Sequence, residues 1–261
     1  MLNKQLLLLK YLKIINFKNK FALVTGAGKG LGRACSIALA ESGAHVMAMS
    51  RTQGDLDGLE KDIRKIKGRI TKIVCDVTNY QDLVKKIKKI KRIDVLVNNA
   101  GTNIPELFKE VKQQSLNHLV NLNLIAAFNV AQLTVQKMLK NKIKDGAIVH
   151  MSSQLGHVGM EGRSVYSMTK FGIEGLTRGM SLELAKSNIR VNAVCPTYVE
   201  TPLVKKVFRN KKLKKLVLSR IPMGKTASES DIATAVCFLA SSSASMITGT
   251  SLLVDGGWTA Q

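Results

Sequence analysis

The chain has 261 residues, 45% of them hydrophobic, which is enough for one well-buried α/β domain and short for two. Its formal charge of +22 raises nucleic acid or an anionic membrane as a partner. The excess is mostly lysine scattered over expected helix faces, with few aromatics between to stack on bases, so we interpret it as a solvated surface and expect no nucleic-acid partner.

The cysteines and histidines do not form a local metal motif. Cys35, Cys75, Cys195 and Cys237 lie far apart without a CxxC pair, and no histidine stands at metal-ligand spacing. We therefore expect no metal site and no disulfide framework. Reduced thiols fit a cytoplasmic protein best.

Residues 1–16, MLNKQLLLLKYLKIIN, differ from the rest of the chain. The LLLL run is too short to span a bilayer, and no small-residue cleavage site follows, so we expect no stable membrane insertion. An amphipathic surface helix and a non-native extension both stay open. The folded domain is expected to cover residues 17–261.

From residue 17 onward, apolar runs alternate with helical patterns. Strands are expected at 21–25, 44–50, 69–75, 93–101, 147–153, 189–195 and 250–257. Helices are expected from the glycine turn to Gly43 and at 54–67, 79–91, 112–140, 164–186 and 228–242. Residues 197–225 break this rhythm and read as a helical insertion, where a lid over a cleft is expected.

Such alternation predicts an α/β fold with a doubly wound parallel sheet of about seven strands and helices on both faces. The continuous Val/Ile/Leu character of the runs agrees, because a parallel sheet is buried on both sides.

The first strand is followed by TGAGKGLG, with glycines at 26, 28, 30 and 32. Glycine permits a tight turn and lets backbone N–H groups approach a pyrophosphate, which the helix N-terminus then favours. Placed between a first strand and a first helix, this run predicts a dinucleotide site.

The end of the second strand indicates which dinucleotide is bound. A carboxylate there would bind a ribose 2′-hydroxyl, but the sequence has Ser50 and Arg51, with no acid before Asp55. Arg51 and Lys29 can neutralise a 2′-phosphate, so NADP(H) is favoured and NAD(H) stays possible. The alternative for both cations is the solvated surface.

Further candidates follow the third and fourth strands. Asp76 could accept from the adenine amino group while Val77 packs on the ring, although an aspartate here also suits a turn. Asn99, Ala100 and Gly101 are small enough for backbone to lie along the cofactor.

The acid/base chemistry is expected from Ser153, Tyr166 and Lys170. Tyr166 and Lys170 are four residues apart in a helical stretch, so both project from one helix face. The ammonium would favour the phenolate form of the tyrosine, and Ser153, at the end of a strand, can hydrogen-bond the reacting oxygen. Asn123, inside the 112–140 helix, needs a partner there, which hints at a held water.

Together, TGAGKGLG, NNAG, Asn123, Ser153, YSMTK and IRVNAVCP resemble the short-chain dehydrogenase/reductase superfamily from about residue 17 to the end. The resemblance implies a Rossmann fold and a catalytic tetrad of Asn123, Ser153, Tyr166 and Lys170. Tyr166 would be the general acid/base, Lys170 would bind the nicotinamide ribose and lower the tyrosine pKa, and Asn123 would hold a relay water. It also implies a homotetramer built from the 112–140 and 164–186 helices and the last strand.

The implied cofactor contacts form one set. They are Gly26, Gly28, Lys29, Gly30, Leu31, Gly32, Ser50, Arg51, Asp76, Val77, Asn99, Ala100, Gly101, Tyr166, Lys170, Pro196, Thr197, Val199 and Thr201. One position departs from the family, because Thr197 stands where a glycine is usual. Thr201 could bond the cofactor or cap a helix.

The substrate is expected to be a small carbonyl compound, a sugar or polyol, or a 3-oxoacyl thioester on a carrier protein. SRTQGDLDGL and SSQ are similar to dicarbonyl/L-xylulose reductases, whereas GTSLLVDGGW is similar to sugar-alcohol dehydrogenases and 3-oxoacyl-carrier-protein reductases. The expected substrate contacts are Ser153, Gln154, His157, Met160 and Tyr198. A nucleotide-binding regulator without turnover is the alternative function.

Overall fold

The structure is a computed structural model that describes residues 15–201, 204 and 208–261. The expected extension at 1–16 therefore lies outside the described residues except for its last two positions. Part of the expected lid, at 202–203 and 205–207, lies outside them as well.

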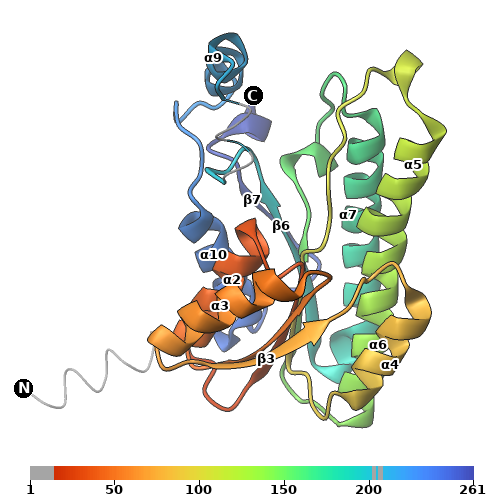
Figure 1. Ribbon diagram of the computed structural model, residues 1–261, viewed down its shortest axis with the longest axis vertical. Helices are drawn as coiled ribbons and strands as arrows, with labels where there is room; N and C mark the ends of the chain where they lie inside the picture. The colour runs from red at the N-terminus through yellow and green to blue at the C-terminus, as the bar shows by residue number, and fades with distance from the viewer. Residues whose placement is uncertain (1–14, 202–203, 205–207) are drawn as a thin grey trace, which may run out of the picture.

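A seven-stranded parallel sheet in the order β3-β2-β1-β4-β5-β6-β7 forms the centre of the domain, which confirms the expected Rossmann-type fold (Figure 1). Its strands are β1 (Phe21–Thr25), β2 (His45–Ser50), β3 (Arg69–Val74), β4 (Val95–Asn98), β5 (Gly146–Met151), β6 (Ile189–Pro196) and β7 (Ser251–Val254). All six neighbouring pairs are parallel, so every strand ends at the same edge.

Helices cover both faces of this sheet (Figure 1). They are α2 (Gly30–Glu41), α3 (Gln53–Lys65), α4 (Tyr80–Lys89), α5 (Gln113–Val120), α6 (Ala126–Lys140), α7 (Ser164–Leu184), α9 (Lys211–Ser219) and α10 (Glu229–Ala240). Alternate strand residues enter two separate cores. Small ones such as Ala22 and Val24 pack with α2, α3 and α10, and larger ones such as Leu23 and Met49 pack with α4 and α6.

The predicted helix over 112–140 is one continuous run that changes its winding in the middle. Asn121–Ile125 form a π-helical segment between α5 and α6. The whole stretch, Gln113–Lys140, is long and apolar enough to cross a membrane by length and composition, a test that a core helix also passes. Its buried side chains, among them Val130 and Met138, pack in the core.

The topology creates a crevice because β1 pairs with β2 on one side and β4 on the other. The chain leaves β1 toward one face of the sheet and leaves β4 toward the other, so their carboxyl ends diverge. Ligands of open α/β sheets bind at this position.

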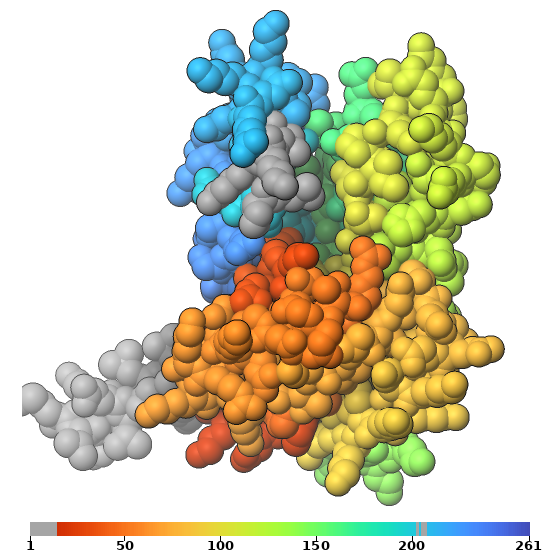
Figure 2. All heavy atoms as spheres, viewed as in Figure 1, coloured from red at the N-terminus to blue at the C-terminus, as the bar shows by residue number. Residues whose placement is uncertain are grey.

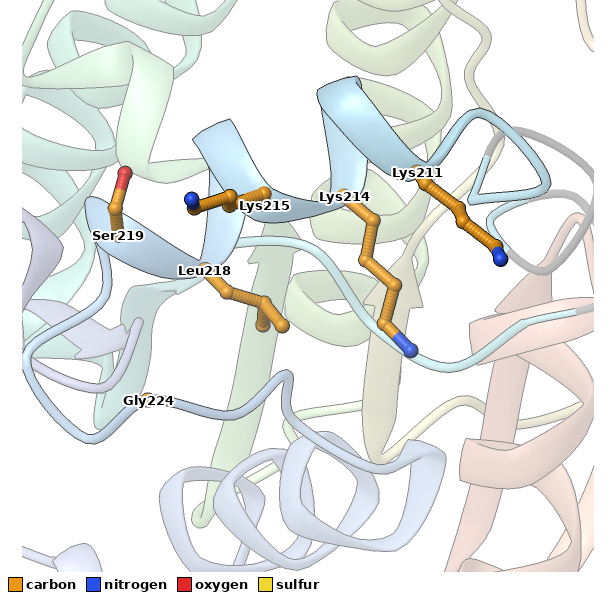
Figure 3. A pocket seen from close by; sticks show the side chains of 6 residues that line it. All are labelled: Lys211, Lys214, Lys215, Leu218, Ser219 and Gly224. Atoms are coloured by element: carbon orange, nitrogen blue, oxygen red, sulfur yellow. The ribbon is translucent and has the colours of Figure 1, made fainter.

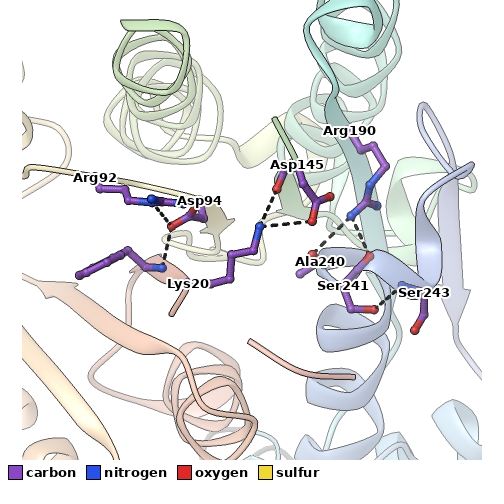
Figure 4. Close-up of polar contacts among 9 residues, drawn as sticks. Lys20, Arg92, Asp94, Asp145, Arg190, Ala240, Ser241 and Ser243 are labelled. Atoms are coloured by element: carbon purple, nitrogen blue, oxygen red, sulfur yellow. Dashed lines mark hydrogen bonds and ion pairs between the residues drawn. The ribbon is translucent and has the colours of Figure 1, made fainter. Parts of the chain in front are cut away.

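The opposite edge is held by buried polar contacts (Figure 4). The fully buried carboxylate of Asp94 accepts from Arg92 Nε at 2.9 and 3.0 Å and from the backbone N–H of Phe21 at 2.9 Å. Nearby, Lys20 pairs with the exposed Asp145 at 3.2 Å. Asp94 therefore joins the start of β1 to the start of β4.

Replacing Asp94 with alanine should lower the free energy of unfolding by about 1–3 kcal/mol, because the partly buried N–H of Phe21 loses its acceptor. Asp145→Ala is the matched control and should cost at most about 1 kcal/mol, since its ion pair is solvated. Urea unfolding followed by circular dichroism measures both. Equal losses in the two variants would contradict this account.

Candidate active site

The predicted site residues meet at the carboxyl edge of the sheet. The glycine turn follows β1, Asn99 follows β4, Ser153 follows β5, and Thr197 follows β6, while Tyr166 comes from α7. In Figure 2 the surface is hollowed between the yellow-green part of the chain near residue 110 and the blue part near residue 215. The edge thus gathers segments that are far apart in sequence.

The glycine turn is shaped for close approach of a ligand. Gly26 and Gly30 have φ angles of +64° and +51°, which favour glycine. A Cβ on Gly32 would lie 2.2 Å from the carbonyl oxygen of Gly26, so this residue lets α2 pack directly on the turn. A Cβ on Gly28 would lie 2.6 Å from Asp55 Cβ. The turn can therefore hold a pyrophosphate at the start of α2.

Thr25, which the sequence analysis missed, fixes this turn to the end of β4. Its hydroxyl accepts from the backbone N–H groups of Asn99 and Ala100 at 3.0 and 3.1 Å. The Asn99 amide in turn donates to the carbonyl of Thr25 at 3.0 Å. A threonine ending the first strand was visible in the sequence, but its partners come from a strand 70 residues later in the chain.

The residues expected to distinguish NADP(H) from NAD(H) gather at the end of β2. Arg51 is exposed, and Lys29 pairs with Asp55 at 3.2 Å. Asp55 also lies beside Ser50, because both side chains would contact a Cβ on Gly28. An acid is thus close to the ribose position in space, although α3 and not the strand end supplies it.

Asp76 and Val77 follow β3. Asp76 Oδ1 accepts from the N–H and hydroxyl of Thr78 at 2.9 and 2.7 Å, which is the turn role considered as its alternative. Burial opposes ionisation of Asp76, but the Thr78 bonds and the charge of Arg51 hold its pKa below the usual value. Arg51 is therefore close enough to act on this carboxylate.

Ser153 lies two residues beyond β5 in a hydrogen-bonded position. Its hydroxyl donates to Gln154 Oε1 at 2.8 Å and accepts from the N–H of Leu155 at 3.1 Å. It also interacts with the Tyr166 phenol, whose pKa it lowers. The structure therefore brings Ser153 and Tyr166 together, as the sequence predicts.

Lys170 lies one helical turn beyond Tyr166. Its ammonium donates to the carbonyl of Met151 at 2.7 Å and lies 5.4 Å from the centroid of the Tyr166 ring. Burial lowers the lysine pKa to about 8, while Cys195 and Glu174 act in the opposite direction.

The phenol of Tyr166 loses its proton less easily than we expect from the sequence. Burial raises its pKa to about 12, and the groups that lower it are Ser153 and Arg163, not Lys170. The Lys170 ammonium lies over the face of the Tyr166 ring and is not directed at the phenol hydroxyl. Without cofactor, the phenol is therefore a proton donor at neutral pH.

Asn123 lies buried in the π-helical segment, and its side chain is hydrogen-bonded to the loop after β4. Its Oδ1 accepts from the N–H of Thr102 at 2.9 Å, and its Nδ2 donates to the Thr102 carbonyl at 2.8 Å and to Thr169 Oγ1 at 3.3 Å. These bonds place Asn123 beside Gly101 and α7. The side-chain amide of Asn123 thus holds the loop after β4, and the water that it is expected to hold stays a prediction.

The expected substrate contacts divide into two groups. Gln154 is buried against Ser153, and the Tyr198 hydroxyl lies 3.9 Å from the sulfur of Met160, with its ring stacked near Phe208. His157 differs, because its Nε2 is directed at Cys195, 3.5 Å away.

Some residues after β6 are held by contacts within the protein, whereas one has a buried hydroxyl without a hydrogen-bond partner among the described residues. Val199 is buried and pairs with Ala227 in a short parallel bridge, and Thr201 Oγ1 accepts from the N–H of Val204 at 3.3 Å, a capping role. Thr201 Cγ2 would also contact a Cβ on Gly30. The Thr197 hydroxyl is buried without a hydrogen-bond partner among the described residues, which fits a site that takes a polar cofactor.

Comparison with known proteins agrees with this geometry. Residues 26–259 match the family described as Enoyl-(Acyl carrier protein) reductase. The chain is 37% identical over 247 residues to 3-oxoacyl-[acyl-carrier-protein] reductase FabG of Thermotoga maritima, covering 93% of this chain and 99% of that protein. It is 39% identical over 238 residues to L-xylulose reductase of Mesocricetus auratus, covering 91% and 95%.

A solved structure is similar over nearly the whole chain. Gluconate 5-dehydrogenase from Burkholderia cenocepacia, in complex with NADP and tartrate, superposes with a TM-score of 0.90 at 27% identity, covering 95% of this chain and 98% of that one. The fold and site define a nicotinamide-dependent oxidoreductase that acts on CH–OH groups. The chain belongs to the short-chain dehydrogenase/reductase family.

Gly32→Ala should weaken NADPH binding by at least about tenfold, because the new methyl group must displace the turn at Gly26 that holds the pyrophosphate. Gly54→Ala is the matched control, since a Cβ at Gly54 meets nothing within 4 Å. Calorimetric titration with NADPH measures both affinities. Unchanged affinity in Gly32→Ala would contradict the assignment of this turn.

Proposed function

We propose that the protein interconverts a secondary alcohol and a ketone with NADP(H), using Tyr166 as general acid in reduction and general base in oxidation. The observation that carries this proposal is the convergence of Ser153, Tyr166 and Lys170 at the same edge of the sheet as the glycine turn. When bound, the nicotinamide ring supplies or accepts the hydride.

The side chains of this site then have separate roles. Ser153 orients the substrate carbonyl and donates to its oxygen, and Tyr166 delivers the proton to that oxygen as negative charge develops. The ammonium of Lys170 favours the phenolate that this transfer leaves behind. Asn123 positions the Thr102 backbone and α7 around the same oxygen.

A small polyhydroxy ketone is the proposed substrate. Gln154, which contacts Ser153, and Tyr198 offer an amide and a hydroxyl that can pair with substrate hydroxyls. The names of L-xylulose reductase and gluconate 5-dehydrogenase among the similar proteins support a sugar or sugar acid.

A second candidate is a 3-oxoacyl thioester on an acidic carrier protein. Lys211, Lys214 and Lys215 extend from α9 beside a hollow of about 480 Å³ (Figure 3). This basic face contains none of the catalytic side chains, so it would hold a carrier and not the reacting group. Similarity to FabG supports this candidate.

A substrate panel followed by NADPH absorbance tests both candidates. It contains L-xylulose, a ketogluconate, and an acetoacetyl thioester offered on pantetheine and on acidic carrier protein. Preference for the sugars by kcat/KM supports the first candidate, and a carrier-dependent gain on the thioester supports the second. No oxidation of NADPH with any of them would refute the proposal.

Tyr166→Phe should lower kcat by about 10²–10⁴-fold on whichever substrate is active, because the proton donor is lost. NADPH affinity should change little, since the aromatic ring stays in place. Tyr80→Phe, at an exposed tyrosine of α4, is the control and should keep full activity. Steady-state kinetics and NADPH titration separate the two effects, and near-normal turnover in Tyr166→Phe would refute the mechanism.

Arg51→Asp should weaken NADPH about ten- to a hundredfold and NADH much less, because a charge-assisted bond to the 2′-phosphate is lost. Lys61→Asp makes the same change of charge at an exposed position of α3 and should leave the NADPH/NADH ratio unaltered. Fluorescence titration with both cofactors gives the ratio. Equal losses of NADPH and NADH affinity would count against a 2′-phosphate site.

We also propose the homotetramer that the family resemblance implies. Exposed apolar side chains on α6 and α7, among them Phe128, Phe171 and Leu182, support association through these helices. Light scattering in solution should give four times the chain mass, and a monomer would refute this assembly.

A further inference from the structure

Three potential metal ligands from separate elements meet behind the catalytic side chains. His157 follows the short helix Gln154–Gly156, Glu174 is on α7, and Cys195 is on β6. We propose that they form a binding site for a divalent cation of the zinc class, with a fourth position left for water. Binding there is independent of the proposed reaction, whereas the inhibition argued below rests on it.

The distances between the three ligand atoms match those around a tetrahedral ion. Cys195 Sγ lies 3.3 Å from Glu174 Oε1 and 3.5 Å from His157 Nε2, and the last two atoms are 3.7 Å apart. Zinc bonds of about 2.3 Å to sulfur and about 2.0–2.2 Å to nitrogen and oxygen at tetrahedral angles place such atoms about 3.4–3.6 Å apart. The cation therefore needs adjustments of a few tenths of an ångström.

The charges of the three groups suit an ion of charge +2. A thiolate, a carboxylate and a neutral imidazole neutralise it, which matters because Cys195 and Glu174 are almost completely buried. Before binding, the Cys195 thiol donates to Glu174 Oε1. On binding, that S–H bond breaks, its proton leaves to solvent, and the sulfur electron pair bonds the cation.

Neighbouring groups orient the ligands. The Ser251 hydroxyl donates to Glu174 Oε2, the carboxylate oxygen that is not directed at the cluster. Burial and then Glu174 raise the pKa of the Cys195 thiol. The Glu174 carboxylate is thus already oriented by a hydrogen bond to its outer oxygen.

An ion can reach this cluster past His157. The His157 side chain is 23% exposed, against 2% for Glu174, so the imidazole forms the outer wall of the cluster. Water entering on this side would complete the coordination shell at the fourth position.

Occupation of the site should inhibit the enzyme through Lys170. Glu174 lies one helical turn beyond Lys170, and the negative charge of Glu174 favours the ammonium form of that lysine against its burial. A bound divalent cation offsets the negative charge that favours the ammonium form of Lys170. Lys170 then loses the charge that assists Tyr166.

The first test is a titration of the full chain with Co²⁺ alone. We expect one ion per chain and a thiolate-to-cobalt charge-transfer band in the near ultraviolet. The net charge of +22 disfavours adventitious cation binding at the surface, which makes the stoichiometry informative. Absence of the band in the wild-type protein would overturn the proposal without reference to any substrate.

Two cysteine variants assign the band. Cys195→Ser should abolish it, whereas Cys237→Ser, at a second buried cysteine in α10, should keep it. A band that persists in Cys195→Ser, or disappears in a normally folded Cys237→Ser, would place the metal elsewhere. Glu174→Gln provides a second ligand variant if Cys195→Ser fails to fold, and should weaken Co²⁺ by at least about tenfold.

Zinc inhibition tests the consequence. Zn²⁺ should slow NADPH oxidation, a chelator should restore it, and Cys195→Ser should need at least about tenfold more Zn²⁺ for the same inhibition. Equal sensitivity of the two proteins would overturn the inhibitory role. If no substrate is found, the cobalt spectrum still decides whether the site exists.

Discussion

The hydrogen bond from the Lys170 ammonium to the carbonyl of Met151 is the interaction on which the site depends. A buried cation needs acceptors nearby, so this bond fixes α7 against the last residue of β5. Tyr166, one turn earlier on the helix, then lies beside Ser153, two residues beyond the strand. One contact between helix and strand thus sets the relative positions of three reactive groups.

The parallel sheet makes such a contact useful because it delivers every strand end to the same edge. Thr25 extends this organisation to the cofactor side, where its hydroxyl holds the backbone after β4 against the end of β1. At the opposite edge of the sheet, the Asp94 carboxylate links the start of β4 to the start of β1. With β1 and β4 tied at both ends, the crevice between their loops keeps its width, and the glycine turn needs no support from a ligand.

Features repeated along one element could be predicted from the sequence. The strands follow from their apolar runs, the shared face of Tyr166 and Lys170 from a four-residue interval, and the glycine turn from its place between strand and helix. Contacts between different helices and strands could not be predicted from the sequence. Asp55 reaches the turn from α3, and His157, Glu174 and Cys195 meet although no two stand at a spacing that indicates a metal site. The π-helical turn at Asn123 has no periodic signal.

The electrostatics of α7 connect these observations. Tyr166, Lys170 and Glu174 occupy successive turns of one helix, so a buried cation separates a phenol from a buried carboxylate. The carboxylate favours the ammonium against its burial. In the proposed mechanism, the ammonium in turn favours the phenolate left after proton transfer. Because Lys170 and Glu174 are buried, the lysine-rich surface adds little to this balance. A change of charge at Glu174 or Cys195 therefore acts first on Lys170, because both groups shift the pKa of that lysine.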